Sequence, residues 1–184
     1  TLCNFIDVTK CSSDDYTKRS DYYCYIGRLS HEKGIKTLIK AANTLPKYKL
    51  IIIGGGPLET ELKSMASNHI KFVGFKQWDE IKRLVSGARF SVVPSECYEN
   101  NPLSIIEAEC LGTPVLGAAI GGIPELITKK TGMTFKSHNV EDLQDKIKAM
   151  FAHSFDYTAI ATASQQRYNA ERHYNKLIKI YQEK

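Results

Sequence analysis

The sequence of 184 residues has little of what marks several protein classes. Its longest apolar stretches, such as residues 50–53, are far too short to span a membrane. Residues 1–10 lack the apolar segment of a secretory leader, so we expect no signal peptide. The five cysteines are an odd number without C-x-x-C spacing. They predict reduced thiols and a cytoplasmic location rather than a disulfide framework.

Strong charge and metal-binding motifs are missing as well. The net charge of +5 is small and spread along the chain. It does not indicate nucleic-acid binding, although it suits a site for a small anion. The five histidines are scattered, and the chain has no zinc spacing, no G-x-x-x-x-G-K-[ST] loop and no Asp-x-Asp. We therefore expect no metal, and side chains and helix ends must supply the positive charge for any bound phosphate.

The 42% of hydrophobic residues can form a core, and short apolar segments alternate with amphipathic ones. Predicted strands lie at 22–26, 50–53, 70–73, 90–93, 114–116 and 134–135. Predicted helices lie at 35–42, 57–66, 78–85, 102–111 and 140–151. This alternation predicts an α/β fold with a parallel sheet and helices on both faces. Residues 157–184 add a predicted helix, which either covers this domain or connects to another one.

Ligands of parallel sheets bind beyond the carboxyl ends of the strands, so candidate residues should lie in loops that follow strands. Residues 27–34 follow the first predicted strand and precede a helix, whose N-terminus favours anions. In this loop Arg28 can bind two phosphate oxygens at once, and Lys33 supplies a compact charge. The alternative is a pair of solvated surface cations.

Two carboxylates with seven residues between them form the second candidate group. Glu99 follows the fourth predicted strand, with Asn101 expected as the N-cap and Pro102 as the first residue of the next helix. Glu107 would then lie inside that helix near the same cleft, free to accept hydrogen bonds from vicinal hydroxyls such as those of a ribose. The alternatives are a capping box from Ser104 to Glu107 and a solvated loop acid at Glu99.

Two glycine clusters, at residues 54–56 and 121–122, also follow predicted strands. Glycine lets the backbone approach a ligand closely, but turns use glycine as well, so the signal is weak. The first cluster resembles the start of a dinucleotide fingerprint. Glu59 stands where the third glycine of G-x-G-x-x-G is required, which argues against NAD.

Taken in order, these motifs resemble the carboxyl-terminal domain of family 4 (group 1) glycosyltransferases of the GT-B fold. The resemblance covers about residues 4–184 and rests on segments 27–34, 54–57, 70–75, 94–95, 99–115 and 121–132. It implies one half of a GT-B fold, namely a Rossmann-like parallel sheet with helices on both faces plus a C-terminal helix. Residues 1–20 would be an interdomain linker remnant, 21–156 the nucleotide-sugar-binding domain and 157–184 the helical tail.

The resemblance also implies an activity, that of a retaining hexosyltransferase that needs no metal or other cofactor. The donor would be a nucleoside-diphosphate sugar such as a UDP- or GDP-sugar. Arg28, Lys33 and Glu99 fall on the catalytic positions, the two cations at the diphosphate and the acid at the donor sugar, and Glu107 falls on the ribose-binding position. The other residues at nucleotide-sugar-binding positions are Gly27, Gly55, Gly74, Phe75, Lys76, Asn100, Asn101, Pro102, Leu103 and Ser104, with Phe75 and Lys76 at the base.

Two departures from the family pattern leave the substrates open. Asn100-Asn101-Pro102 stands where the family often has Gly-Phe-Gly, so the donor sugar is undetermined. The family's amino-terminal acceptor domain is not in this sequence, so we expect the chain to be an inactive fragment with that domain as its partner. The expected acceptor is a glycan or lipid-linked saccharide of bacterial surface polysaccharide. The expected location is the cytoplasm, including the inner face of the membrane through peripheral contact. Alternatives are a GT-B epimerase, a phosphorylase and a non-catalytic nucleotide-binding module.

Overall fold

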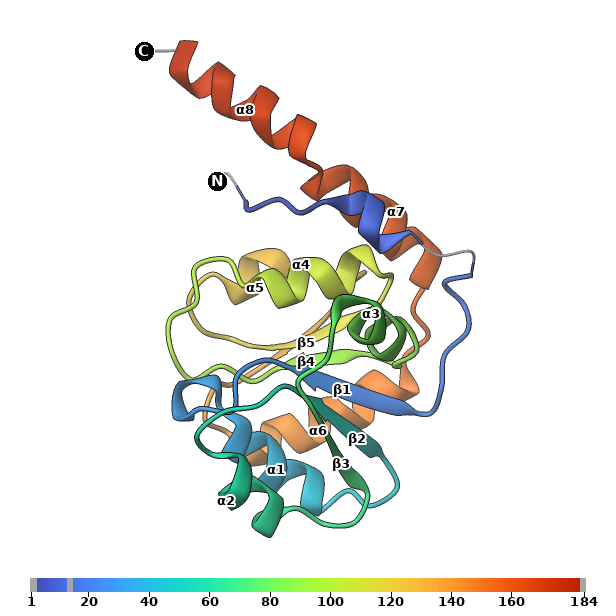
Figure 1. Ribbon diagram of the computed structural model, residues 1–184, viewed down its shortest axis with the longest axis vertical. Helices are drawn as coiled ribbons and strands as arrows, with labels where there is room; N and C mark the ends of the chain where they lie inside the picture. Colours follow the sequence, from blue (N-terminus) through green and yellow to red (C-terminus); the bar gives the residue numbers. More distant parts are fainter. Residues whose placement is uncertain (1–2, 13–14, 183–184) are drawn as a thin grey trace.

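A computed structural model describes residues 3–12 and 15–182 (Figure 1). The predicted α/β fold is confirmed, with six parallel strands in one sheet of order β3-β2-β1-β4-β5-β6. The strands are β1 (Tyr22–Ile26), β2 (Lys49–Ile53), β3 (Ile70–Gly74), β4 (Ser91–Val93), β5 (Val115–Ala118) and β6 (Gly132–Phe135). The order reverses between β1 and β4, and loops that follow strands on either side of such a point form a crevice.

Helices cover both faces of this sheet (Figure 1). On one face lie α1 (Ile35–Asn43), α2 (Glu59–Met65) and α6 (Val140–Ala152). On the other face lie α3 (Trp78–Ser86), α4 (Leu103–Cys110) and α5 (Ile123–Leu126). The predicted helices and strands begin and end within two residues of these bounds. The one-turn helix α5 and the two 3-10 turns η1 (Val8–Cys11) and η2 (His31–Lys33) were not predicted from the sequence.

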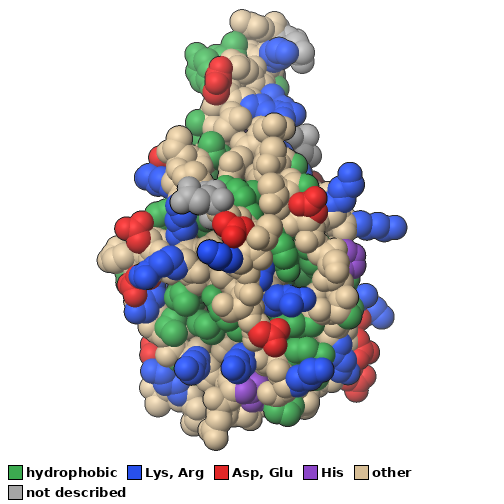
Figure 2. Space-filling view, turned by 90° about the vertical axis from the view of Figure 1, so that its right-hand side faces the viewer, with side chains coloured by type: hydrophobic (Ala, Val, Ile, Leu, Met, Phe, Trp, Pro, Cys, Tyr) green, Lys and Arg blue, Asp and Glu red, His purple; other side chains and the backbone are tan. Residues whose placement is uncertain are grey.

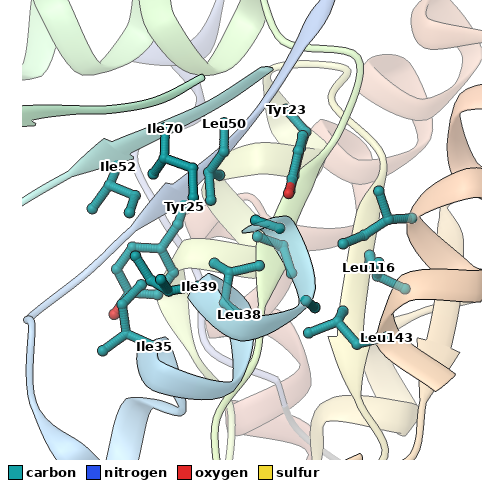
Figure 3. Close-up of a cluster of buried hydrophobic side chains, with 14 of the residues drawn as sticks. Tyr23, Tyr25, Ile35, Leu38, Ile39, Leu50, Ile52, Ile70, Leu116 and Leu143 are labelled. Atoms are coloured by element: carbon teal, nitrogen blue, oxygen red, sulfur yellow. The ribbon is translucent and has the colours of Figure 1, made fainter. Parts of the chain in front are cut away.

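Side chains alternate along the strands and so build two cores. Tyr23 and Tyr25 of β1 project toward α1, where they meet Leu38 and Ile39 (Figure 3). Cys24, between the two tyrosines, belongs to the core on the opposite face. The Tyr23 ring also stacks on Phe90, with ring centroids 5.1 Å apart. Because the central strands are buried on both faces, they appear in the sequence as continuous apolar runs.

The tail forms two helices rather than the one helix predicted. Helix α7 (Tyr157–Tyr168) packs on α4, and Tyr168 is buried. Helix α8 (Ala170–Gln182) has no buried residue and projects from the body of the molecule (Figure 1). Between them Asn169 is extended, with φ −73° and ψ 153°. The division of the chain at residues 20 and 156 stays a prediction.

The segment that precedes β1, called the lead-in below, is anchored to the domain at two points. Near its start, Ile6 donates its backbone N–H to the Tyr168 carbonyl at 3.1 Å and pairs with Asn169. Near its end, the Arg19 guanidinium donates to the Thr113 hydroxyl at 2.7 Å and to backbone carbonyls at and just after the C-terminal ends of α3 and α4. Burial lowers the pKa of Arg19 to about 10. The linker remnant predicted at residues 1–20 lies partly outside the described residues, which omit 1, 2, 13 and 14.

Candidate functional site

The loops after β1, β2 and β3 meet at the carboxyl edge of the sheet. Gly27 donates its N–H to the Ile53 carbonyl at 3.1 Å, and Leu29 donates to the Gly55 carbonyl at 3.0 Å. Gly54 donates to the Gly74 carbonyl at 2.9 Å. These bonds extend the strand pairing into the loops. They bring together the three predicted site glycines, which are Gly27, Gly55 and Gly74.

A hollow of about 330 Å³ opens between these loops. Its wall includes five predicted site residues, namely Gly27, Arg28, Gly55, Phe75 and Lys76, and the isoleucine side chains of Ile26, Ile53 and Ile81. The Phe75 side chain is 78% exposed, which is unusual for a large apolar group and suits a flat ligand. Lys76 forms an ion pair with Glu80 at 2.8 Å. The exposed Arg28 side chain makes no hydrogen bond or ion pair within the described residues, and the charge of Glu32 lies near it.

Lys33 and Glu99 form an ion pair across two loops, one after β1 and the other after β4. Lys33 Nζ lies 2.5 Å from Glu99 Oε1, and the Ser95 hydroxyl donates to the same oxygen at 3.0 Å. The Glu99 side chain is only 17% exposed. It is therefore not a solvated loop acid, and Lys33 is not a solvated surface cation. Of the two predicted cations, only Arg28 has its charge directed to solvent.

Glycines fix the backbone around this ion pair. Gly34 has φ +65°, and a Cβ there would lie 1.8 Å from the Pro94 carbonyl oxygen. Gly122 donates its N–H to the Glu99 carbonyl at 2.7 Å. A Cβ at Gly121 would lie 2.6 Å from that same oxygen. The loops after β1 and β5 can approach the loop that carries Glu99 only because glycine occupies these positions.

A second carboxylate in the loop after β4 was not predicted from the sequence. Glu96 accepts a hydrogen bond from the Thr37 hydroxyl at 2.5 Å, and its Oε2 lies 3.4 Å from His138 Nδ1. Its backbone N–H donates to the Glu32 carbonyl at 2.9 Å. The loops after β1, β4 and β6 are thus tied together through Glu96. No motif in the sequence distinguishes it from a solvated acid.

The start of α4 differs from the prediction. The helix begins at Leu103, and Pro102 is the N-cap, with φ −67° and ψ 123°. Asn101 is therefore not the N-cap. The Asn101 carbonyl accepts a hydrogen bond from Asn4 at 3.0 Å, and its buried Oδ1 has no partner among the described residues. This contact with the lead-in holds Asn101 outside the helix. Ser104 lies inside the helix, so the capping box with Glu107 does not form.

Glu107 lies on α4 and, unlike Glu99, is not part of an ion pair. Its carboxylate is half-buried and makes no hydrogen bond or ion pair within the described residues. Burial raises the pKa of Glu107. Burial also raises the pKa of Cys11 to about 11, and the nearby Glu107 charge adds to this. The structure joins Lys33 to Glu99 but does not join Glu107 to either, so its ribose-binding role stays a prediction.

Metal sites, membrane spans and disulfides are all absent from residues 3–12 and 15–182. No group of three or more His, Cys, Asp or Glu in this part is placed to hold a metal ion. No helix within it has the length and apolar character needed to cross a bilayer. All five cysteines lie in this part and are free thiols. The groups available to a ligand at the site are the cations Arg28, Lys33 and Lys76, the paired carboxylate of Glu99, the exposed ring of Phe75 and the backbone.

This chain is similar to a known protein family, to individual proteins of known sequence and to solved structures. Residues 14–173 match the family of glycosyl transferases group 1. The sulfoquinovosyl transferase of Arabidopsis thaliana is 32% identical over 131 residues, which are 68% of this chain. The glycogen synthase of Mycobacterium tuberculosis is 30% identical over 175 residues and 80% of this chain. The Anabaena HepE structure with UDP and glucose superposes over 98% of this chain with TM-score 0.82 at 19% identity.

In each case the match covers only part of the known protein. It spans 26% of the Arabidopsis enzyme, 42% of the mycobacterial enzyme and 56% of the Anabaena chain. The structural match identifies this sheet as the carboxyl-terminal half of a GT-B fold. The family match extends over most of the residues from the lead-in to α8 and includes every loop of the site. The chain therefore belongs to the group 1 glycosyl transferases.

Proposed function

We propose that this chain is the donor-binding half of a retaining glycosyltransferase that uses a nucleoside-diphosphate sugar. The Lys33–Glu99 ion pair carries this proposal, because it joins residues 66 apart in sequence at the edge where ligands of parallel sheets bind. Arg28, five positions before Lys33, lines the neighbouring hollow with a free guanidinium. Membership of the glycosyl transferase family supports the same activity.

Each residue has a role in the proposed reaction. The bond between the anomeric carbon and the diphosphate breaks, and the nucleoside diphosphate leaves with the bonding electrons. The oxygen of an acceptor hydroxyl bonds to the anomeric carbon with retention, and the hydroxyl proton is released. Arg28 and Lys33 stabilise the negative charge that develops on the leaving diphosphate, and no metal is needed for this. Glu99 binds the donor sugar near its anomeric carbon. The base stacks on Phe75 beside Lys76, and Glu107 accepts hydrogen bonds from the ribose.

Backbone groups complete the proposed donor site. The first N–H groups of α4, at Leu103 and Ser104, have no partner inside the helix and favour phosphate or sugar oxygens. Asn100, Asn101 and Pro102 shape the pocket for the sugar. The donor is a UDP- or GDP-sugar. HepE was solved with UDP and glucose, and a mannosyltransferase of Corynebacterium glutamicum, 26% identical over 157 residues, is GDP-mannose-dependent.

The proposed partner is an acceptor-binding domain in a longer enzyme. Helix α8 exposes the large hydrophobic side chains of Tyr174, Ile180 and Tyr181, and Phe5 is exposed on the lead-in. An acceptor domain that covers these side chains would close the cleft over the donor. The isolated chain should then bind donor but not transfer sugar. A saccharide of surface polysaccharide, built at the cytoplasmic face of the membrane, is the proposed acceptor.

Amide NMR tests the donor site directly. UDP, GDP, ADP and NAD are titrated into the labelled chain, and we expect one diphosphate to shift amides of residues 27–34 and 99–107. Arg28→Ala should weaken that binding at least about tenfold, since hydrogen bonds to charged groups contribute about 1.5–3 kcal/mol. Arg172→Ala, which removes an exposed arginine of α8, is the matched control. Binding of NAD alone, or no shift with any of the four, would contradict the proposal.

The Glu99→Gln variant distinguishes binding of the nucleotide from binding of the sugar of the donor. The substitution removes the charge that now neutralises Lys33, so we expect UDP to bind severalfold more tightly. UDP-glucose should lose its advantage over UDP, because the carboxylate that receives the sugar hydroxyls is gone. Isothermal titration with both ligands measures the two effects. Glu125→Gln, an exposed acid on α5, should change neither. Equal weakening of both ligands would refute a sugar-binding Glu99.

A further inference from the structure

A second hollow lies at the opposite edge of the sheet from the donor site. Its volume is about 570 Å³, which is in the range of small-molecule sites. It is bounded by the end of α4, one side of α7, the turn at residues 128–131 before β6 and the loop at residues 153–156 after α6. Figure 2 looks toward this edge of the sheet, and Lys and Arg side chains predominate over Asp and Glu on the face that it shows.

The wall of this hollow contains a buried carboxyl that the donor site does not use. Glu109 is only 1% exposed, although it lies two residues after Glu107 on the same helix. Its Oε1 is buried and accepts no hydrogen bond of ordinary geometry from the described residues, although the hydroxyls of Thr131 and Ser164 lie near the carboxyl. Its Oε2 has a long contact of 3.5 Å with the Tyr168 hydroxyl. An unpartnered buried carboxyl oxygen is costly, so a ligand group that reaches it would gain a strong hydrogen bond.

The rim of the hollow carries positive charge. Lys129, Lys130 and Arg167 line it, all three are exposed, and none has an ion pair in the part of the chain that the structure describes. The Asp156 side chain, also at the rim, accepts a hydrogen bond from the Ala159 N–H at 2.9 Å and caps α7. Three cations close to one buried carboxyl disfavour a cationic ligand and favour an anion at the mouth.

An apolar platform completes the hollow. The rings of His153 and Phe155 contact each other with centroids 4.2 Å apart, and both line the wall. Ile160 and the methyl groups of α7 alanines extend this surface. A purely apolar ligand would leave the Glu109 oxygen unpaired. A ligand that matches all three features has hydroxyls for Glu109, a ring face for Phe155 and an anionic group for the cations.

We propose that this hollow binds a sugar monophosphate. Its hydroxyl groups donate to the Glu109 carboxyl in the wall, and its phosphate lies at the rim against Lys129, Lys130 and Arg167. The carbon-bound hydrogens of the sugar pack against Phe155. This site shares no residue with the donor site, and the proposal does not depend on the proposed glycosyl transfer.

The test titrates glucose 6-phosphate, glucose and inorganic phosphate into the labelled chain with UDP present in excess. We expect glucose 6-phosphate to shift amides of residues 128–131 and 164–167 at millimolar concentration, more strongly than either of the other probes. Shifts at these residues are distinct from shifts at residues 27–34, so failure of the donor site and failure of this site can be told apart.

Two variants assign the contacts. Lys129→Ala with Lys130→Ala should weaken glucose 6-phosphate at least about tenfold. The matched control is Lys40→Ala with Lys71→Ala, which removes the same charge from two exposed lysines elsewhere. Glu109→Met keeps the bulk of the buried side chain and should abolish the preference for glucose 6-phosphate over inorganic phosphate. No shift at residues 128–131, equal binding of phosphate and glucose 6-phosphate, or an unchanged preference in Glu109→Met would overturn the proposal.

Discussion

Replacing Gly34 by alanine is expected to lower the free energy of unfolding by about 4 kcal/mol or more, at the far end of the range for single substitutions. The backbone of Gly34 has φ +65°, which costs other residues about 1–2 kcal/mol. The added Cβ would also lie 1.8 Å from the Pro94 carbonyl oxygen. That oxygen belongs to the buried backbone at the end of β4, so one of the two loops must move.

Gly74→Ala is the matched control for this prediction. Gly74 has φ +71°, but no heavy atom lies within 4 Å of the position that a Cβ would take there. The substitution should therefore cost only the backbone part, about 1–2 kcal/mol. Urea unfolding of the two variants measures the difference. Amide shifts around Glu99 should accompany the Gly34 change, because the displaced loop carries the Lys33 partner. Similar costs for the two variants would show that the contact with Pro94 is not limiting.

The fold was predictable because its signals are local. The run Leu50-Ile51-Ile52-Ile53 followed by glycine indicates a buried strand, and the structure places β2 there. The spacing of Ile35, Leu38, Ile39 and Ala42 indicates α1 in the same way, and all four are buried. In each of these segments the arrangement of apolar residues along the sequence is that expected for the strand or helix that the segment forms. The order of the strands was not predicted, because right-handed connections fix the hand of each crossover but not which strands become neighbours.

The break in the tail could not be predicted from local signals. Residues 157–182 contain neither glycine nor proline, so this stretch lacks the residues that most strongly break a helix. The extended backbone there pairs with Ile6, which lies more than 160 residues earlier. The Asn169 side chain then accepts a hydrogen bond from the Arg172 N–H at 2.7 Å and starts α8. A tertiary contact selects the break, and a local capping residue makes it tolerable.

The position of the candidate residues in the fold was predictable, but their pairings were not. The rule that ligands bind beyond strand ends placed Arg28, Lys33 and Glu99 at one edge of the sheet. It did not predict that Lys33 and Glu99 neutralise each other. The prediction of Asn101 as the N-cap and Pro102 as the first helical residue was wrong, because a proline is compatible with the N-cap as well as with the first turn. The contact from Asn4 decided between them.

The burial of Glu109 was not predicted from the sequence, and it has a measurable effect on the stability of the chain. Burial raises the pKa of its carboxyl from 4.5 to about 7. Between these values the folded chain holds a proton that the unfolded chain has released. Stability from this group is therefore complete below about pH 4.5 and is lost as the pH rises through about 7. The difference corresponds to about 3 kcal/mol.

We therefore expect the chain to become less stable relative to its Glu109→Gln variant as the pH rises from 5 to 8. Glutamine keeps the shape of the side chain but has no proton to lose, so the variant should gain about 3 kcal/mol over the wild type across this range. Urea unfolding of both proteins at several pH values gives the two profiles. Glu125→Gln, which removes an exposed acid, should follow the wild type.

Parallel pH profiles for the two proteins would be explained by the neighbours of Glu109. Burial favours the neutral carboxyl, whereas the hydroxyls of Thr131, Tyr168 and Ser164 and the charge of Arg167 all favour the carboxylate. Burial outweighs them only while water stays out of the wall of the second hollow, since a hydrated carboxylate would lose most of its desolvation penalty. Parallel profiles for wild type and Glu109→Gln would mean that these neighbours outweigh burial and that Glu109 is ionised throughout. A bound sugar monophosphate whose hydroxyls donate to Glu109 would favour the carboxylate as well, so ligand should flatten the wild-type profile and leave that of Glu109→Gln unchanged.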